Sequence, residues 1–459
     1  RPPRSTLFPY TTLFRSYLTT AVLSGASLSG ANLTRTDLTG SDLSNTDLTR
    51  VDLKHVSLTG ADLRNSQLIG MDLTEVNLTG VKLSGADLTG ADLTGADLAG
   101  MDLTGTDLSS ANLTDVDLSG ANLTGAHLKG TTLFGAALKN SNLTNAILSD
   151  TDLRRVILTG VDLSGADLRN AHLAGVDLSG TNLKGGHLAG ANLSNGDFYG
   201  ANLTGADLRN ANLTGADLSG ADLTGADLTG AAVTRVNLMG ATLSDTDLTG
   251  ANLSGAALSD RDLRSANLTG ASLAASDLRN VNLTGMNLSG ADLSEANLTD
   301  TNLSGVDLSN SNLSGADLHH TDLSGAKLIG AKLIGANLTG ANLMGADVSR
   351  TDLTDVNLTD VNLTDVRLSD GNLSGMNLSG IKMTKANLTN ASLTGANLTS
   401  VNLTGADLTG ANLSGANLTD VDVSGANLTG VKLRGATLFG AVLKNSNLSN
   451  AILSDTDLR

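Results

Sequence analysis

Residues 21–40 read A-V-L-S-G, A-S-L-S-G, A-N-L-T-R and T-D-L-T-G, and this five-residue step continues unbroken to Arg459. From residue 21 onward, every position whose number ends in 3 or 8 is apolar, and almost all are Leu. The residue before it is usually Asp or Asn, and the one before that is small or apolar, most often Ala. Thr or Ser follows the Leu, and Gly often comes next. A period this strict is the first guide to the fold.

Neither regular secondary structure would place these Leu residues on one face. In an α-helix five residues turn about 500°, so successive Leu side chains would lie about 140° apart around the axis. In a single strand successive Leu side chains would point to opposite faces, because five is an odd number. The spacing therefore predicts a chain that turns once per pentad, with Leu and Ala inside and coils hydrogen-bonded to their neighbours. The spacing alone leaves three or four sides per coil open.

The fifth residue of each pentad is expected to form the corner, because Gly reaches positive φ at little steric cost. Where Gly is absent, Asn and Asp are frequent, and these residues tolerate the left-handed region best among the others. Examples are Asn45, Asn65, Asn140, Asp355 and Asp360.

The A-[DN]-L-X-X pattern resembles the motif of the pentapeptide-repeat family, and the resemblance covers almost the whole chain. It implies an all-β fold, a right-handed quadrilateral β-helix with four pentads per coil and about 22 coils. Some acidic members of that family are DNA mimics that bind DNA gyrase, a type II topoisomerase, and protect it from quinolones. This chain lacks the loops that interrupt the coils in some of those relatives.

The repeat also predicts the domain organisation. Residues 1–16 do not follow it, and residues 6–16 read TLFPYTTLFRS, which resembles a translated sequencing-library adapter. We therefore expect 1–16 to be a non-native segment and 17–459 to form a single continuous β-helix that is truncated at both ends. Residues 433–459 repeat residues 128–154 with 23 of 27 positions identical, and no capping segment follows them. Uncapped coils would favour end-to-end self-association.

The charge balance limits the partners. The formal net charge is -17 at pH 7, which opposes electrostatic binding to nucleic acid or to an anionic membrane and allows binding to a basic protein surface. In all, 33 Asp residues precede the central position, and twenty-residue steps divide them 8, 10, 6 and 9 among four faces. This even division disfavours a dedicated acidic face. No apolar run approaches the roughly 18 residues of a membrane span.

The sequence contains no catalytic or ligand-binding motif that can be distinguished from the repeat itself. The absence of cysteine excludes disulfides and thiolate metal ligands. None of the six histidines forms an i, i+4 pair, and no nucleophile elbow, phosphate loop or carboxylate pair stands out. We predict no catalytic, cofactor-binding or metal-binding residue, no cofactor and no enzymatic activity. Four successive corners carry carboxylates that point apart and so are not expected to bind one cation, namely Asp355, Asp360, Asp365 and Asp370.

Several positions extend or break the pattern. Arg261 is the one charged residue at the inward position, with Asp260 and Asp262 as adjacent possible partners. Outward apolar residues include Phe134, Tyr199 and Phe439. Ile329 and Ile334 form a small apolar–basic spot with Lys327 and Lys332, which is a candidate partner site. One column is expected to stack as an amide ladder, namely Asn337, Asn357, Asn377, Asn397 and Asn417.

We expect a non-catalytic, cytoplasmic rod that acts as a structural scaffold or protein-interaction module and has no direct nucleic-acid partner. The alternative is a DNA mimic that binds DNA gyrase and protects it from quinolones. The even division of carboxylates and the basic residues within the rows disfavour the alternative.

Overall fold

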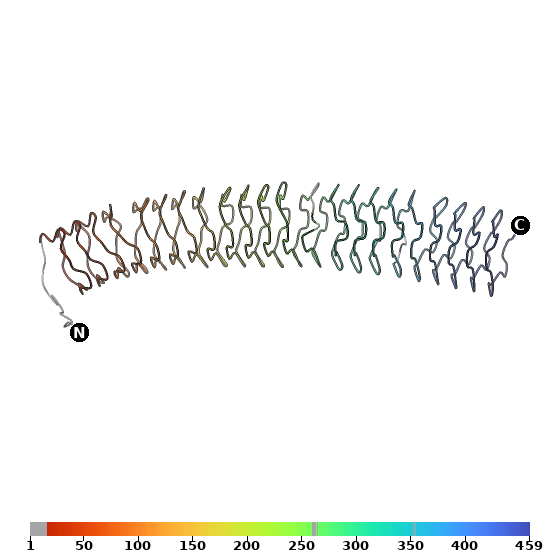
Figure 1. Cartoon of the computed structure of the whole chain (residues 1–459), viewed down its shortest axis with the longest axis horizontal. Coiled ribbons are helices and arrows are strands. Elements are labelled where there is room, and N and C mark those ends of the chain that lie inside the picture. Colours follow the sequence, from red (N-terminus) through yellow and green to blue (C-terminus); the bar gives the residue numbers. More distant parts are fainter. Residues whose placement is uncertain (1–15, 259–262, 264, 352, 354) are drawn as a thin grey trace. The chain divides into compact units, whose positions relative to one another are not determined.

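A computed structural model describes residues 16–258, 263, 265–351, 353 and 355–459. Residues 1–15 of the segment expected to be non-native lie outside the described residues, as do Asp260, Arg261 and Asp262. Figure 1 shows the backbone winding in successive coils. By its internal contacts the chain groups into two compact units. Unit 1 comprises residues 1–232 and 240–246, and unit 2 comprises residues 233–239 and 247–459.

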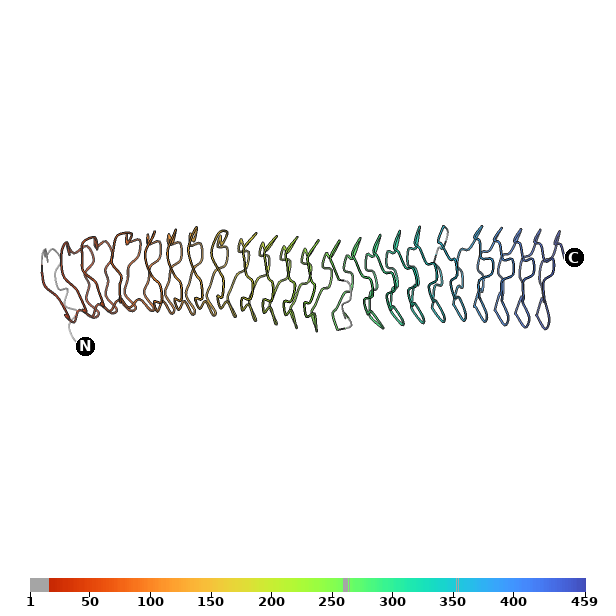
Figure 2. The same cartoon turned by 90° about the horizontal axis from the view of Figure 1, so that it is seen from above.

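Each pentad contributes a single bridging residue to a stack of coils. The described residues contain no helix and no extended strand, and the Asp or Asn position carries an isolated parallel bridge instead. Each bridge joins residues twenty positions apart, such as Asp87 and Asp107 in unit 1 or Asn397 and Asn417 in unit 2. Twenty residues are four pentads, so this register settles the number of sides that periodicity left open. Figure 2 shows the successive coils within each unit.

Backbone hydrogen bonds join each coil to the next. Leu88 N donates to Asp107 O at 2.7 Å, and Gly90 N donates to Ser109 O at 2.9 Å. In the opposite direction Asp107 N donates to Ala86 O at 2.9 Å. Buried backbone groups need such partners, and the coil above or below supplies them in place of a strand neighbour. The architecture is therefore a β-helix solenoid.

Each corner is a β-turn that begins at the Leu. Ala91 N donates to Leu88 O at 2.9 Å, and Gly90 has a φ of 66°. Positive φ at this third position alone is the geometry of a type II turn. The corners predicted for Asn45, Asn65, Asn140, Asp355 and Asp360 all have positive φ. Larger residues such as Arg155 and Lys385 also adopt it at corners, which the sequence did not suggest.

The core consists of the Leu column and the small residue two positions earlier. Leu88 and Leu298 have no exposed surface, and neither have Ala86 and Ala296. Serine and threonine at the small position are satisfied by carbonyls, as Ser41 Oγ donates to Leu38 O at 2.7 Å. The inside and outside positions predicted from the pentad are thus confirmed.

One departure from the repeat in the core has a steric explanation. Phe198 takes the place of Leu and is fully buried. Gly196 takes the place of the usual Ala, and a Cβ there would lie 2.9 Å from Cε2 of the Phe198 ring. The larger ring is therefore accommodated by removing the methyl group beside it.

Candidate interaction surface

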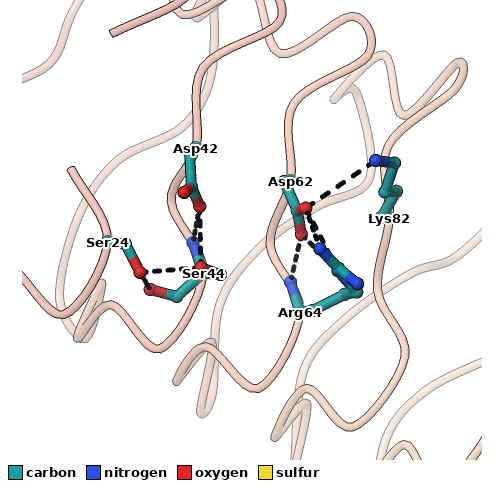
Figure 3. Close-up of polar contacts among 6 residues, drawn as sticks. All are labelled: Ser24, Asp42, Ser44, Asp62, Arg64 and Lys82. Atoms are coloured by element: carbon teal, nitrogen blue, oxygen red, sulfur yellow. Dashed lines mark hydrogen bonds and ion pairs between the residues drawn. The ribbon is translucent and has the colours of Figure 1, made fainter. Parts of the chain in front are cut away.

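The Asp or Asn of each pentad holds the turn that follows it. In Figure 3, Asp42 Oδ1 accepts hydrogen bonds from Ser44 N at 3.0 Å and from Ser44 Oγ at 2.7 Å. Asp87 holds Thr89 in the same way, at 3.0 and 2.6 Å. The bond needs only a side-chain oxygen two residues before the donor, which Asp and Asn both supply. This shared oxygen explains why the two residues alternate freely along the chain.

Asparagine adds a contact between coils. Asn397 Nδ2 donates to Asn377 Oδ1 at 3.0 Å, and Asn417 Nδ2 donates to Asn397 Oδ1 at 3.4 Å. The predicted amide ladder is therefore confirmed over these three residues. Asn357 Nδ2 donates instead to Thr339 Oγ1 at 2.9 Å. Much of the outward polar surface is thus occupied by the fold itself.

Basic side chains also bind carboxylates at the Asp or Asn position of the pentad. Arg64 forks onto Asp62 through Nε and Nη2, and Lys82 Nζ lies 3.8 Å from Asp62 Oδ2 (Figure 3). The hydrogen bond from Arg64 is the main cause that lowers the pKa of Asp62. Arg209 binds Asp207 at 2.7 Å and lies 3.6 Å from Asp227 in the next coil. The basic partner in each pair is exposed to solvent, and surface pairs stabilise a fold by little, about 0–1 kcal/mol.

Two histidines lie close to carboxylates, and these His–Asp pairs were not predicted from the sequence. His127 Nδ1 lies 3.8 Å from Asp107 Oδ2, and His320 Nδ1 lies 3.7 Å from Asp300 Oδ1. Each pair is twenty residues apart, so the coil period was the signal that could have found them. The His319 and His320 rings stack with centroids 3.8 Å apart. Among the described residues, no group of three or more His, Cys, Asp or Glu could hold a metal ion.

Grooves open where bulky residues stack at the inward position. Val51 and Met71 occupy it in neighbouring coils of unit 1, and no bridge joins residues 52 and 72, both of which are described. A groove of about 390 Å³ lies there. Val356 and Met376 do the same in unit 2, where a groove of about 380 Å³ lies over residues 355–359 and 374–377. Bulky inward residues do not always break the bridge, because Asn362 and Lys382 remain bridged beside Val361 and Ile381.

The apolar–basic spot predicted in unit 2 is exposed. Ile334 is 59% exposed and Ile329 is 36% exposed. Lys327 Nζ, however, lies 3.6 Å from Asp307 Oδ2 in the preceding coil. The two Ile residues are one pentad apart and so lie at successive corners, which separates them. In the part of the chain that the structure describes, no helix is long and apolar enough to cross a membrane.

Comparison with known proteins agrees with the pentad geometry. The family model described as pentapeptide repeats, 8 copies, matches overlapping segments that together span residues 16–54, 57–360 and 362–459. The chain belongs to the pentapeptide-repeat family. No curated protein matches this pentapeptide-repeat chain.

Three solved pentapeptide-repeat structures are similar to it. HetL, involved in heterocyst differentiation regulation in the cyanobacterium Nostoc sp. strain PCC 7120, is 31% identical over 56% of this chain and 89% of its own, with a TM-score of 0.24. Rfr23 from the cyanobacterium Cyanothece 51142 is 38% identical over 20% of this chain and 60% of its own, with a TM-score of 0.17. QnrB1, a plasmid-mediated fluoroquinolone resistance protein, is 21% identical over 46% of this chain and 89% of its own, with a TM-score of 0.22.

Proposed function

We propose that this pentapeptide-repeat chain is a non-catalytic scaffold that binds other proteins through its outward side chains. The observation that carries the proposal is the turn-holding bond, in which Oδ1 of each Asp or Asn accepts from the residue two positions later, as Asp87 accepts from Thr89. The bond fixes the ladder side chains on a regular lattice. A lattice of this kind presents groups in rows, and catalysis requires groups that converge on one reacting atom.

The finer architecture belongs to the same proposal. We expect the coil to be right-handed, in keeping with the general chirality of parallel crossover connections. Residues 17–459 would then form one β-helix of about 22 coils, since each coil takes four pentads. The protein is proposed to act in the cytoplasm, without a cofactor and without direct contact to nucleic acid.

Photo-crosslinking in the source cells tests the proposed function. A diazirine analogue of leucine replaces Tyr199, which is 63% exposed, and in a control chain it replaces the fully buried Leu298, whose size and shape it closely matches. Discrete cross-linked proteins from the first chain and none from the control are expected. If purified chain turned over a substrate and neither chain cross-linked a protein, the proposal would be wrong.

The alternative function is a DNA mimic for DNA gyrase. Exposed carboxylates on one face of unit 1 favour it, including Asp97, Asp117, Asp177 and Asp197. Ala137 and Ile157 interrupt this row, however, and duplex phosphates form an uninterrupted row of charge. We therefore rank the alternative second.

A further inference from the structure

One face of unit 1 places an apolar centre between two acidic ends. Bridges at twenty-residue steps stack Asp97 on Asp117, Asp117 on Ala137, and Ala137 on Ile157. The same step leads from Ile157 to Asp177, and a bridge joins Asp177 to Asp197. This column, here called the 97–197 face, consists of Asp97, Asp117, Ala137, Ile157, Asp177 and Asp197.

The four carboxylates of the 97–197 face are available to a partner. All four Asp residues are exposed, and none of them forms an ion pair with a described residue. In each the Oδ1 atom accepts from the backbone two residues later, as Asp117 accepts from Ser119 N at 2.9 Å. Asp207, in the column on the opposite side of the coil, is instead half-buried and bound by Arg209 at 2.7 Å. The 97–197 face thus differs from the opposite column in exposure, although the two columns differ little in carboxylate count.

The centre of the face is apolar and has an aromatic edge. Ile157 is 52% exposed, and so is Phe134, which lies at the corner before Ala137. The Arg155 guanidinium carbon lies 5.4 Å from the Phe134 ring centroid. A hollow of about 310 Å³ is lined by Phe134, Asp152, Arg154 and Arg155. Lys139 follows Leu138 at the opposite corner, so basic groups border the centre on both sides.

We propose that the 97–197 face binds a protein segment that has an apolar centre and basic residues at both ends. The inference rests on the proposed protein-binding function and names the chemistry of the partner. Basic ends would pair with the exposed carboxylates, and an apolar centre would bury Ile157 and Phe134. Arg155 and Lys139 would repel a basic residue at the centre, which selects against a uniformly cationic segment.

The dimensions of the face set the length of the segment. Neighbouring coils lie about 4.8 Å apart, so the five steps from Asp97 to Asp197 span about 24 Å. An extended segment rises about 3.3 Å per residue and covers that span with about seven or eight residues. The peptide Lys-Lys-Gly-Leu-Leu-Gly-Lys-Lys has this length and charge pattern and serves as the probe.

Fluorescence anisotropy of the labelled peptide with the full chain tests the proposal. We expect the peptide to bind at least about tenfold more tightly than Lys-Lys-Gly-Ser-Ser-Gly-Lys-Lys, which lacks the apolar centre. Asp117→Asn combined with Asp177→Asn removes two charges and keeps the turn-holding oxygens, and should weaken binding by about tenfold. Ile157→Ser should remove the preference for the apolar peptide. Asp102→Asn removes a single charge at an exposed Asp of another column, serves as the control for position, and should leave binding unchanged.

Three results would overturn the inference. The two peptides could bind equally, Asp102→Asn could weaken binding as much as the paired substitution, or neither peptide could bind. Each result would show that the 97–197 face is not a specific binding site. None of them would decide the proposed function, which the cross-linking experiment tests. The inference and the proposed function can therefore fail separately.

Discussion

The side-chain amide of Asn112 donates a hydrogen bond of 3.2 Å to Oδ1 of Asp92 in the preceding coil of unit 1. That same Oδ1 accepts from Thr94 N at 3.0 Å and from Thr94 Oγ1 at 2.6 Å. A single carboxylate oxygen therefore accepts hydrogen bonds both from its own turn and from the next coil. In unit 2, Asn342 donates to Asp322 at 3.1 Å in the same way.

Asn112→Asp tests this contact between coils. The substitution removes the Nδ2 donor and places a second carboxylate over Asp92, so we expect a loss of about 1 kcal/mol in the free energy of unfolding. Asn402→Asp is the matched control, because Asn402 lies over Lys382 and an Asp there would gain an opposite charge. Urea unfolding of both variants provides the comparison. An equal loss from both would contradict the role given to Asn112.

The Leu column should govern stability. Leu298 has no exposed surface, so Leu298→Asp would bury a charge without a partner and lower the free energy of unfolding by several kcal/mol. Asp227→Asn keeps the oxygen that accepts from Thr229 N at 2.9 Å and should change stability by less than about 0.5 kcal/mol. Thermal melts of the two variants check this, and similar shifts would refute the assignment of inside and outside.

One ion pair predicts a dependence on pH. Lys54 Nζ lies 2.7 Å from Asp72 Oδ2, and its hydrogen bond is the main cause that lowers the pKa of Asp72 to about 2. Because the folded pKa lies below the unfolded value of about 3.9, the stabilisation is present above that value and is lost as the pH falls toward 2.

Lys54→Met removes the ion pair and keeps an apolar stem of similar length. The pKa of Asp72 should rise in this variant, while the bonds from Thr74 still hold it below its ordinary value. Carboxyl-carbon NMR titration of the Asp72 side chain in both chains measures the shift. An unchanged titration midpoint would show that Lys54 does not bind Asp72 in solution.

Much of the fold could be predicted from the pentad, because every Leu obeys the same constraint. Leu298 lies inside and Asn65 lies at a left-handed corner, as the pattern requires. Periodicity did not fix the number of sides, since a Leu can face inward in a coil of three or four pentads. That number became visible only when the bridge between Asp87 and Asp107 gave the register.

The interaction surface could be predicted only in part. Counting Asp residues by twenty-residue steps found the columns but not their exposure, which depends on neighbours in adjacent coils. Asp117 is exposed and Asp107 is half-buried, although both precede a Leu in the same motif. The turn-holding role of Asp and Asn was also missed, because sequence reasoning took these residues as outward-facing and gave their oxygens no partner.

The gyrase alternative makes a separate prediction. A DNA mimic needs a continuous negative face, and Ala137 and Ile157 interrupt the most exposed row of unit 1. We expect weak, salt-sensitive binding at best and no protection of DNA gyrase from a quinolone at equimolar chain. A supercoiling assay at two salt concentrations, with and without the drug, checks this. Strong protection at physiological salt would place the DNA mimic first.

The repeated Asp or Asn serves the fold through one side-chain oxygen, and its charge is secondary. Asp87, whose Oδ1 accepts from Thr89 N and Oγ1 at 3.0 and 2.6 Å, tests this most directly. We predict that Asp87→Asn changes the free energy of unfolding by less than about 0.5 kcal/mol, whereas Asp87→Ala lowers it by about 1 kcal/mol or more. The measurement is urea unfolding of the two variants beside the unchanged chain. Equal stability of the Asn and Ala variants would contradict the claim.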